Sequence, residues 1–216
     1  MRIGVLGTGV VGRGVASKLV DVGHEVRLGS RDAAHAGASD WAAAAGERAS
    51  NGKFEDAAAF GELVFNCTGG AVSLEALEQA GEDSLRGKVL VDVSNPLDFS
   101  RGRPPSLSVP SWDSVAEQIQ RRFPETRVVK ALNTINADVM TDPGRVPGEH
   151  EVFLCGDDDG AKNDVRSILE SFGWRREAIV DLGGLTAARG LEAYVLFWVN
   201  LMGAVGSPHF NIHVVR

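Results

Sequence analysis

A glycine-rich turn directly follows the first apolar run of this 216-residue chain. The run is "RIGVL", and the turn Gly7-Thr8-Gly9-Val10-Val11-Gly12 has the spacing G-x-G-x-x-G. Between a strand and a helix, this spacing is typical of a Rossmann phosphate-binding turn. Gly7 would permit the tight bend, Gly9 would let the main chain approach a pyrophosphate, and Gly12 would let the helix pack closely. A glycine-rich turn without a ligand is the alternative.

The chain then alternates between short apolar runs and helical patterns. Strands are expected at 2–7, 24–29, 52–55, 62–68, 88–94 and 127–132. Such alternation predicts an α/β fold, a doubly wound parallel sheet with helices on both faces. A Pro/Gly-rich stretch at 140–150 reads as a linker, and a smaller α/β unit ending in a long helix follows it. We therefore expect a dinucleotide-binding domain at 1–140 and a small C-terminal domain at 150–216, which would carry the acceptor site and the dimer contact.

Two helices carry specific expectations. Ser111 is the expected N-cap of a helix that contains Trp112 and Ile119, and Pro124 is its expected stop. The long final helix, near 186–205, is apolar around most of its circumference. A helix of this kind must be buried on nearly all sides, and in so small a unit a partner subunit is the expected cover. The sequence therefore predicts a homodimer.

The tetrapeptide "GSRD" stands at 29–32, at the end of the second expected strand. Enzymes that prefer NAD place a carboxylate there for the ribose 2′-hydroxyl, and a carboxylate would repel a 2′-phosphate. Ser30 and Arg31 instead offer a hydroxyl and a guanidinium, which suit a phosphate dianion. We therefore expect NADP(H) as the cofactor. Asp32 leaves alternatives open, because it could pair with Arg31 or act as the acid, and Arg31 could be a solvated surface charge.

Three further strand ends carry uncharged polar residues at the edge where ligands bind in open parallel sheets. These residues are Thr68-Gly69-Gly70, Ser94-Asn95 and the run Asn133-Thr134-Ile135-Asn136. The glycines would permit close approach of the dinucleotide, while the amides and hydroxyls could bind a carboxamide or a substrate oxygen. Capping of loops is the alternative for Asn95 and Asn133. Asp92 and Lys130 lie inside strands and are expected to be paired core groups.

Composition excludes several classes of protein. A net charge of −7 is unfavourable for a general nucleic-acid binder. Cys67 and Cys155 lie in apolar runs and are expected to be reduced, buried thiols, with neither a disulfide nor a metal site. The longest apolar segment, 193–205, is shorter than the roughly 20 residues of a membrane span. Without a visible signal peptide, we expect a cytoplasmic protein that binds no membrane.

Three stretches together resemble the NADPH-dependent deazaflavin (coenzyme F420) reductase family. They are "MRIGVLGTGVVGRGVASKLVDVGHEVRLGSRD", "VVKALNTINADVM" and "GSPHFNIHVVR". The resemblance implies NADP binding by the glycine turn with Thr8, Ser30 and Arg31, reversible hydride transfer to a deazaflavin, and a homodimer. It also implies that Asn133 and Ile135 position the acceptor. The chain departs from the family's pattern at Asn133, where characterised members carry a histidine.

The sequence contains no convincing pair of residues for proton transfer, and this fits hydride exchange between two cofactors, where positioning does most of the work. The leading hypothesis is therefore an NADPH-dependent oxidoreductase that acts on a deazaflavin or a flavin. A non-catalytic NADP(H)-binding or sensing protein is the alternative from another class. A dehydrogenase of the β-hydroxyacid or imine-reducing kind is a third reading, although the residues after the linker are too few for its large helical second domain.

Overall fold

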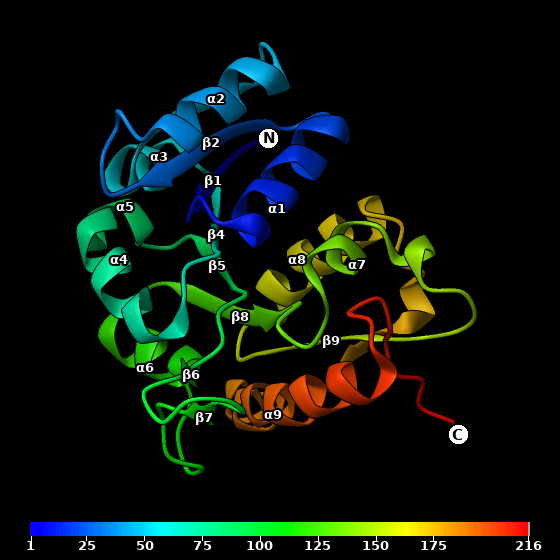
Figure 1. Cartoon of the computed structure of the whole chain (residues 1–216). Coiled ribbons are helices and arrows are strands. Elements are labelled where there is room, and N and C mark those ends of the chain that lie inside the picture. Colours follow the sequence, from blue (N-terminus) through cyan, green and yellow to red (C-terminus); the bar gives the residue numbers. More distant parts are fainter. Residues whose placement is uncertain (216) are drawn as a thin grey trace.

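An eight-stranded sheet runs through the molecule in the order β10-β9-β8-β5-β4-β1-β2-β3. The computed structural model describes residues 1–215, and Figure 1 shows helices on both faces of this sheet. The strands are β1 (Arg2–Leu6), β2 (Glu25–Ser30), β3 (Ala49–Lys53), β4 (Leu63–Asn66), β5 (Val89–Asp92), β8 (Arg127–Ala131), β9 (Val152–Gly156) and β10 (Ile179–Asp181), with a small hairpin of β6 (Leu97–Asp98) and β7 (Ser106–Leu107) beside them. Neighbours from β3 to β8 are parallel, as predicted.

The C-terminal residues add two strands to this same sheet. β9 runs antiparallel to β8, with Lys130 opposite Cys155, and β10 runs parallel to β9. The segments 1–140 and 150–216 therefore share one sheet. Whether they fold as two separate domains stays a prediction. Residue 216, the end of the predicted second domain, lies outside the described residues.

Helices cover the sheet in two layers, each with its own core. The helices are α1 (Val10–Asp21), α2 (Ala36–Ala45), α3 (Phe54–Phe60), α4 (Ser73–Ala80), α5 (Glu82–Leu85), α6 (Val115–Arg122), α7 (Ala137–Thr141), α8 (Asp159–Ser171) and α9 (Ala188–Val205), with 3-10 turns η1 (Gly70–Val72), η2 (Pro143–Arg145), η3 (Arg176–Ala178) and η4 (Leu185–Ala187). One core joins the sheet to α1, α2, α7 and α8, and the other joins it to α3, α4, α5, α6 and α9. Alternating strand residues, such as Val64 and Phe65, enter opposite cores.

The helix expected to begin after Ser111 begins later. Ser114 is its N-cap, with extended backbone and a side chain that accepts a hydrogen bond from the main-chain N–H of Glu117. Trp112, expected on the buried face, is 70% exposed. The reason is a turn before the helix, in which the Asp113 N–H donates to the carbonyl of Pro110. The predicted stop at Pro124 is correct, because α6 ends at Arg122.

The long final helix forms as predicted, but one side of it faces outward in the single chain. Leu191 and Val195 are buried, whereas Phe197 is 57% and Val205 is 53% exposed. Figure 1 shows α9 lying across the C-terminal part of the molecule, with the tail turning back from its end. Within residues 1–215, neither this helix nor another is both long and apolar enough to cross a membrane.

Candidate functional site

The three glycines of the turn after β1 have different surroundings, and each is required for a different reason. Gly7 has φ +112°, and a Cβ there would lie 2.7 Å from the Cys67 carbonyl oxygen. A Cβ on Gly12 would lie 1.8 Å from the Gly7 carbonyl oxygen, so α1 can only pack this closely with glycine at that position. A Cβ on Gly9 would meet no described atom within 4 Å. Gly9 therefore faces open space at the start of α1, where main-chain N–H groups bind anions.

Two adjoining cavities open at this end of the sheet. They have volumes of about 600 and 460 Å³ and share Gly9, Cys67, Thr68 and Gly69 in their walls. The larger cavity is also lined by Gly7, Thr8, Ser30, Arg31, Asp32, His35, Phe54, Val72, Glu75, Ala76 and Gln79. The smaller is also lined by Val10, Val11, Val93, Ser94, Asn95, Leu97, Asn133, Ile135, Asn136, Ala137, Met140, Val195, Trp198 and Val199. The two adjoining cavities form a groove that most of the predicted site residues line, whereas Gly12 and Gly70 line neither cavity.

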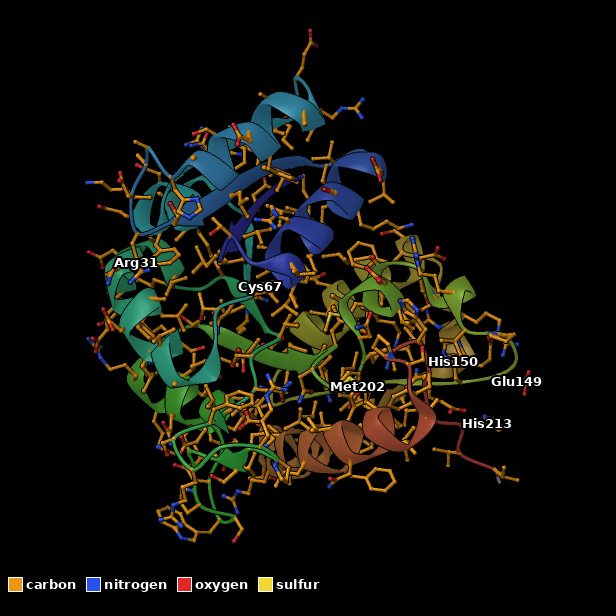
Figure 2. The ribbon with its side chains drawn as sticks, viewed as in Figure 1. Arg31, Cys67, Glu149, His150, Met202 and His213 are labelled. Carbon is orange, nitrogen blue, oxygen red and sulfur yellow. The ribbon has the colours of Figure 1, made fainter. Side chains whose placement is uncertain are left out.

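Arg31, which directly follows β2, has a side chain without a polar partner among residues 1–215. Its side chain is exposed, and within residues 1–215 it makes neither a hydrogen bond nor an ion pair. The Asp32 carboxylate instead accepts a hydrogen bond from the Ala34 N–H at 2.9 Å, and the Asp32 carbonyl accepts one from the Ser30 hydroxyl. Asp32 therefore folds its own loop and does not pair with Arg31. Figure 2 shows Arg31 near the margin of the molecule, on the side of α4.

Asn95 and Asn133, which follow β5 and β8, fix each other's orientation by hydrogen bonds. Asn95 Nδ2 donates to the Asn133 carbonyl at 2.8 Å. Asn133 Nδ2 donates to Asn95 Oδ1 and to the Leu191 carbonyl, both at 2.9 Å. Because both amide hydrogens of Asn133 have acceptors, its amide cannot flip without losing them. The residue before it, Leu132, has φ +66°, a costly conformation for leucine that here sets the direction of the following chain.

Two residues that line the smaller cavity each carry an unpaired polar atom. Asn133 Oδ1 and Ser94 Oγ are buried and have no hydrogen-bond partner among the described residues. Both side chains belong to residues that are about 3% exposed. Buried polar groups in folded proteins are nearly always paired, so such orphans in a cavity wall point to a ligand. One atom accepts hydrogen bonds and the other can donate.

The loop after β4 divides its predicted roles between two residues. Gly69 lines both cavities, and a Cβ there would meet no described atom within 4 Å. Gly70 instead packs on the main chain of Asn95, where a Cβ would lie 2.4 Å from the carbonyl oxygen. Its N–H donates to that same oxygen at 3.1 Å. Thr68 is held by a 2.6 Å hydrogen bond to Asn66 Oδ1. Gly70 thus supports Asn95 and does not itself face the groove.

Sequence reasoning missed several lining residues. His35 is the N-cap of α2, and its Nδ1 accepts a hydrogen bond from the Ala38 N–H at 3.2 Å. Val195, Trp198 and Val199 have helical i, i+3, i+4 spacing and form the α9 wall of the smaller cavity. That spacing shows that the three residues share one face of the helix, but it does not tell a core face from a cavity wall.

A buried charge cluster supports the groove from beneath. Lys130 Nζ lies 2.7 Å from Asp92 Oδ2 and 2.8 Å from Glu192 Oε1, and it donates to the Ser94 carbonyl at 2.6 Å. Glu192 also accepts hydrogen bonds from two N–H groups at the start of α6. Burial alone would lower the pKa of Lys130, but the two carboxylates raise it. Burial raises the pKa of Glu192 against the opposing effect of Lys130. Asp92 and Lys130 are paired core groups, as expected; the sequence did not indicate that they pair with each other, nor that Glu192 joins them.

Both cysteines are free thiols. Cys155 is buried, as expected, whereas Cys67 is only partly buried, because it lies in the wall that the two cavities share. Burial, with a smaller contribution from the Asp92 carboxylate, raises the pKa of Cys67. Burial also raises the pKa of Cys155 to about 12. Neither thiol is therefore poised as a nucleophile at neutral pH. Within residues 1–215 no group of three or more His, Cys, Asp or Glu side chains is arranged to hold a metal ion.

Comparison with known proteins relates the chain to two kinds of reductase. Residues 2–96 match the family model described as "NADP oxidoreductase coenzyme F420-dependent". The F420-dependent NADP reductase of Methanothermobacter marburgensis is 30% identical over 213 residues, which cover 93% of this chain and 92% of the relative. The metalloreductase STEAP3 of Rattus norvegicus is 32% identical over 200 residues. That match covers 90% of this chain but only 36% of the metalloreductase, so the chain spans about a third of that relative's length.

Solved structures carry the likeness over the whole chain. A crystal structure from Arthrobacter sp. FB24, of a protein assigned to the F420-dependent NADP reductases, has a TM-score of 0.95 and 48% identity, and the match covers both chains completely. The imine reductase of Streptomyces aurantiacus has a TM-score of 0.65 and 22% identity, over 94% of this chain and 64% of that one. This second likeness is one of fold alone.

Proposed function

The chain belongs to the family of coenzyme F420-dependent NADP oxidoreductases, and from that premise we propose that it transfers hydride between NADP(H) and a deazaflavin or flavin. The observation that carries the proposal is the pair of adjoining cavities, which reach from the unpaired guanidinium of Arg31, past the open face of Gly9, to Ser94 and Asn133 with their unpaired polar atoms. Each stretch of this groove matches one part of the dinucleotide. The acceptor's identity and the direction of transfer are the finer parts of the proposal.

Arg31 would bind the 2′-phosphate of the adenine ribose. Its guanidinium has no partner among residues 1–215, and a fork of N–H donors binds phosphate oxygens bidentately. The Ser30 hydroxyl donates to the Asp32 carbonyl, so it would reach the phosphate only by leaving that bond. We therefore assign Arg31 the larger share of the discrimination. The N–H groups at the start of α1, beside Gly9, would hold the diphosphate.

Ser94 and Asn133 would hold the nicotinamide carboxamide. The Ser94 hydroxyl can donate to the carboxamide oxygen, and Asn133 Oδ1 can accept from the carboxamide nitrogen. Since Asn133 Nδ2 is held by Asn95 Oδ1 and the Leu191 carbonyl, only its oxygen is free. This donor and acceptor match a primary carboxamide, and filling both would remove the cost of two unpaired buried groups. The orphaned atoms thus fit the proposed cofactor.

The bound NADPH would supply a hydride, which carries two electrons and one proton to the acceptor, and the acceptor's second proton would come from water. The chain's own task is to position the two rings and keep solvent from the reacting face. The smaller cavity suits this task because apolar side chains, among them Val93, Ile135 and Met140, line much of it. Ile135, which is 5% exposed, can position the acceptor, as the resemblance implies, whereas Asn133 would act on it only indirectly, by holding the nicotinamide. Positioning of this kind needs no dedicated acid or base.

The proposal includes a homodimer and a cytoplasmic setting. The exposed apolar side chains of Phe197 and Val205 on α9 support the dimer, since a partner's surface would cover them. Free thiols at both cysteines support a reducing compartment. Light scattering at micromolar protein measures the mass, and a mass of one chain, about 22.9 kDa, would contradict the dimer.

Mixing the protein with NADPH and oxidised coenzyme F420, FMN or FAD tests the reaction. We expect the absorbance of both NADPH and the oxidised acceptor to fall in equal molar amounts, because one hydride passes per pair. Tight NADPH binding without turnover of these three acceptors would instead favour a binding or sensing protein.

A further inference from the structure

We propose that the indole N–H of Trp198 recognises the acceptor by donating a hydrogen bond to a carbonyl oxygen at the edge of a planar heterocycle. This inference rests on the proposed function and names the group that selects the second substrate. Trp198 lies on α9, and it lines the smaller cavity together with Val195 and Val199. Its Nε1 is buried and has no hydrogen-bond partner among residues 1–215. A buried tryptophan N–H usually has a partner, so this one is free for a ligand.

The position of Trp198 separates it from the cofactor contacts. Ser94 and Asn133 follow strands β5 and β8 and are matched by the carboxamide, whereas Trp198 comes from the helix that forms another wall. The carboxamide therefore leaves the indole N–H unused. A second molecule that occupied the same cavity beside the nicotinamide would meet this donor.

The indole is held in place by the C-terminal tail. The Phe210 ring stacks on it, with centroids 5.4 Å apart and planes 23° apart. The tail is docked in turn on Glu151, whose N–H donates to the Ile212 carbonyl and whose carboxylate accepts from the Val214 N–H at 2.9 Å. Figure 2 shows His213 of the tail near His150, beyond the end of α9 that Met202 marks. The donor is thus fixed by packing and does not have to be ordered when the acceptor binds.

The chemistry of this wall favours one class of acceptor. An N–H group repels a metal cation but pairs with a carbonyl oxygen, and a tryptophan nitrogen cannot accept a hydrogen bond. Around it, Val195, Val199 and Met140 offer apolar surface that suits the face of an aromatic ring. A flat ring with a carbonyl edge, as in the pyrimidinedione of deazaflavins and flavins, satisfies both. A free metal ion satisfies neither, although metalloreductases are among the chain's relatives.

The variant Trp198→Phe tests the inference, because it keeps an aromatic ring against Phe210 and removes only the N–H donor and part of the ring. We expect the KM for coenzyme F420 or FMN to rise about 3- to 10-fold, the range of one neutral hydrogen bond. The dissociation constant for NADPH and the melting temperature should not change. Trp112→Phe is the matched control, since Trp112 is exposed and does not line the cavity.

Binding of the oxidised acceptor to the protein–NADP⁺ complex, followed by the fluorescence of F420 or FMN, separates this inference from the reaction. If the wild type binds the acceptor more tightly than Trp198→Phe but shows no turnover, the recognition site stands and the hydride transfer fails. If the wild type turns over and Trp198→Phe retains its KM and its acceptor affinity within twofold, the reaction stands and the inference is overturned. Absence of acceptor binding by the wild type overturns the inference as well.

Discussion

The variant Lys130→Met examines the buried charge cluster beneath the groove. In the wild type the ammonium lies 2.7 Å from Asp92 and 2.8 Å from Glu192, and Lys130 and Asp92 are completely buried. Methionine has nearly the same length, so it fills the space but leaves two carboxylates in a low dielectric without their cation. Removal of one partner from a buried pair typically costs about 3–5 kcal/mol. Because a domain unfolds with about 5–15 kcal/mol, this loss is a large share of the total.

Urea unfolding followed by circular dichroism measures the loss as a fall in the midpoint at constant slope. Arg122→Met is the matched control, because Arg122 also bridges two carboxylates, Glu78 and Glu82, but all three side chains are about half exposed. It should unfold nearly as the wild type does. The double variant Lys130→Met/Glu192→Gln should regain part of the lost stability, since one of the two uncompensated charges is gone.

The same variant makes a prediction about pH. The folded-state pKa of Glu192 is already raised above its usual 4.5, chiefly by burial, and loss of the Lys130 charge removes what opposes this rise. The folded state then binds a proton that the unfolded state releases, so its stability falls as pH rises from about 4.5 through the raised pKa. We expect Lys130→Met to lose more stability than the wild type between pH 5 and 8. Equal stability of Lys130→Met and wild type across this range would refute the assigned role of the cluster.

The remaining predictions concern the groove. Gly9→Ala should melt like the wild type but bind NADPH at least about tenfold more weakly, because its Cβ meets no described atom yet projects where the diphosphate would lie; Gly12→Ala, with its Cβ 1.8 Å from a carbonyl oxygen, should lower the melting temperature. The reverse ranking in a thermal melt would contradict both assignments. Ser94→Ala should unfold at the same urea concentration as the wild type or a slightly higher one, since it removes a buried hydroxyl that has no partner among the described residues, and it should weaken NADPH binding about 3- to 10-fold in a fluorescence titration. Unchanged NADPH affinity would remove Ser94 from the carboxamide site.

The sequence predicted those parts of the site that depend on neighbouring residues. Gly7 and Gly12 have the packing roles that the spacing of the turn implied, and Gly9 has the open face. Strand-ending residues such as Ser94 and Asn133 converge because parallel strands end at the same edge of the sheet. These features follow from local geometry together with one rule of topology.

Features that depend on distant partners could not be predicted in this way. Glu192 reaches Lys130 across 62 positions of the chain, and a helical pattern does not say which face meets a buried charge. The apolar run that forms β9 likewise does not indicate that this strand is antiparallel to β8. The sequence also did not show why residue 70 is a glycine: a larger residue would collide with the main chain of Asn95, which is distant in sequence. The turn that delays α6 to Ser114 depends on which of two nearby serines has the extended backbone of a cap.

The central claim is that Arg31 binds a 2′-phosphate at one end of the groove. Calorimetric titration of the wild type and of Arg31→Ala with NADPH and NADH, at one fixed salt concentration, tests it most directly. We predict that the wild type binds NADPH about 10- to 100-fold more tightly than NADH, the range of a charge-assisted pair, and that Arg31→Ala loses most of this difference without a change in NADH affinity. Equal affinity of the wild type for the two nucleotides, or an undiminished preference in Arg31→Ala, would contradict the claim.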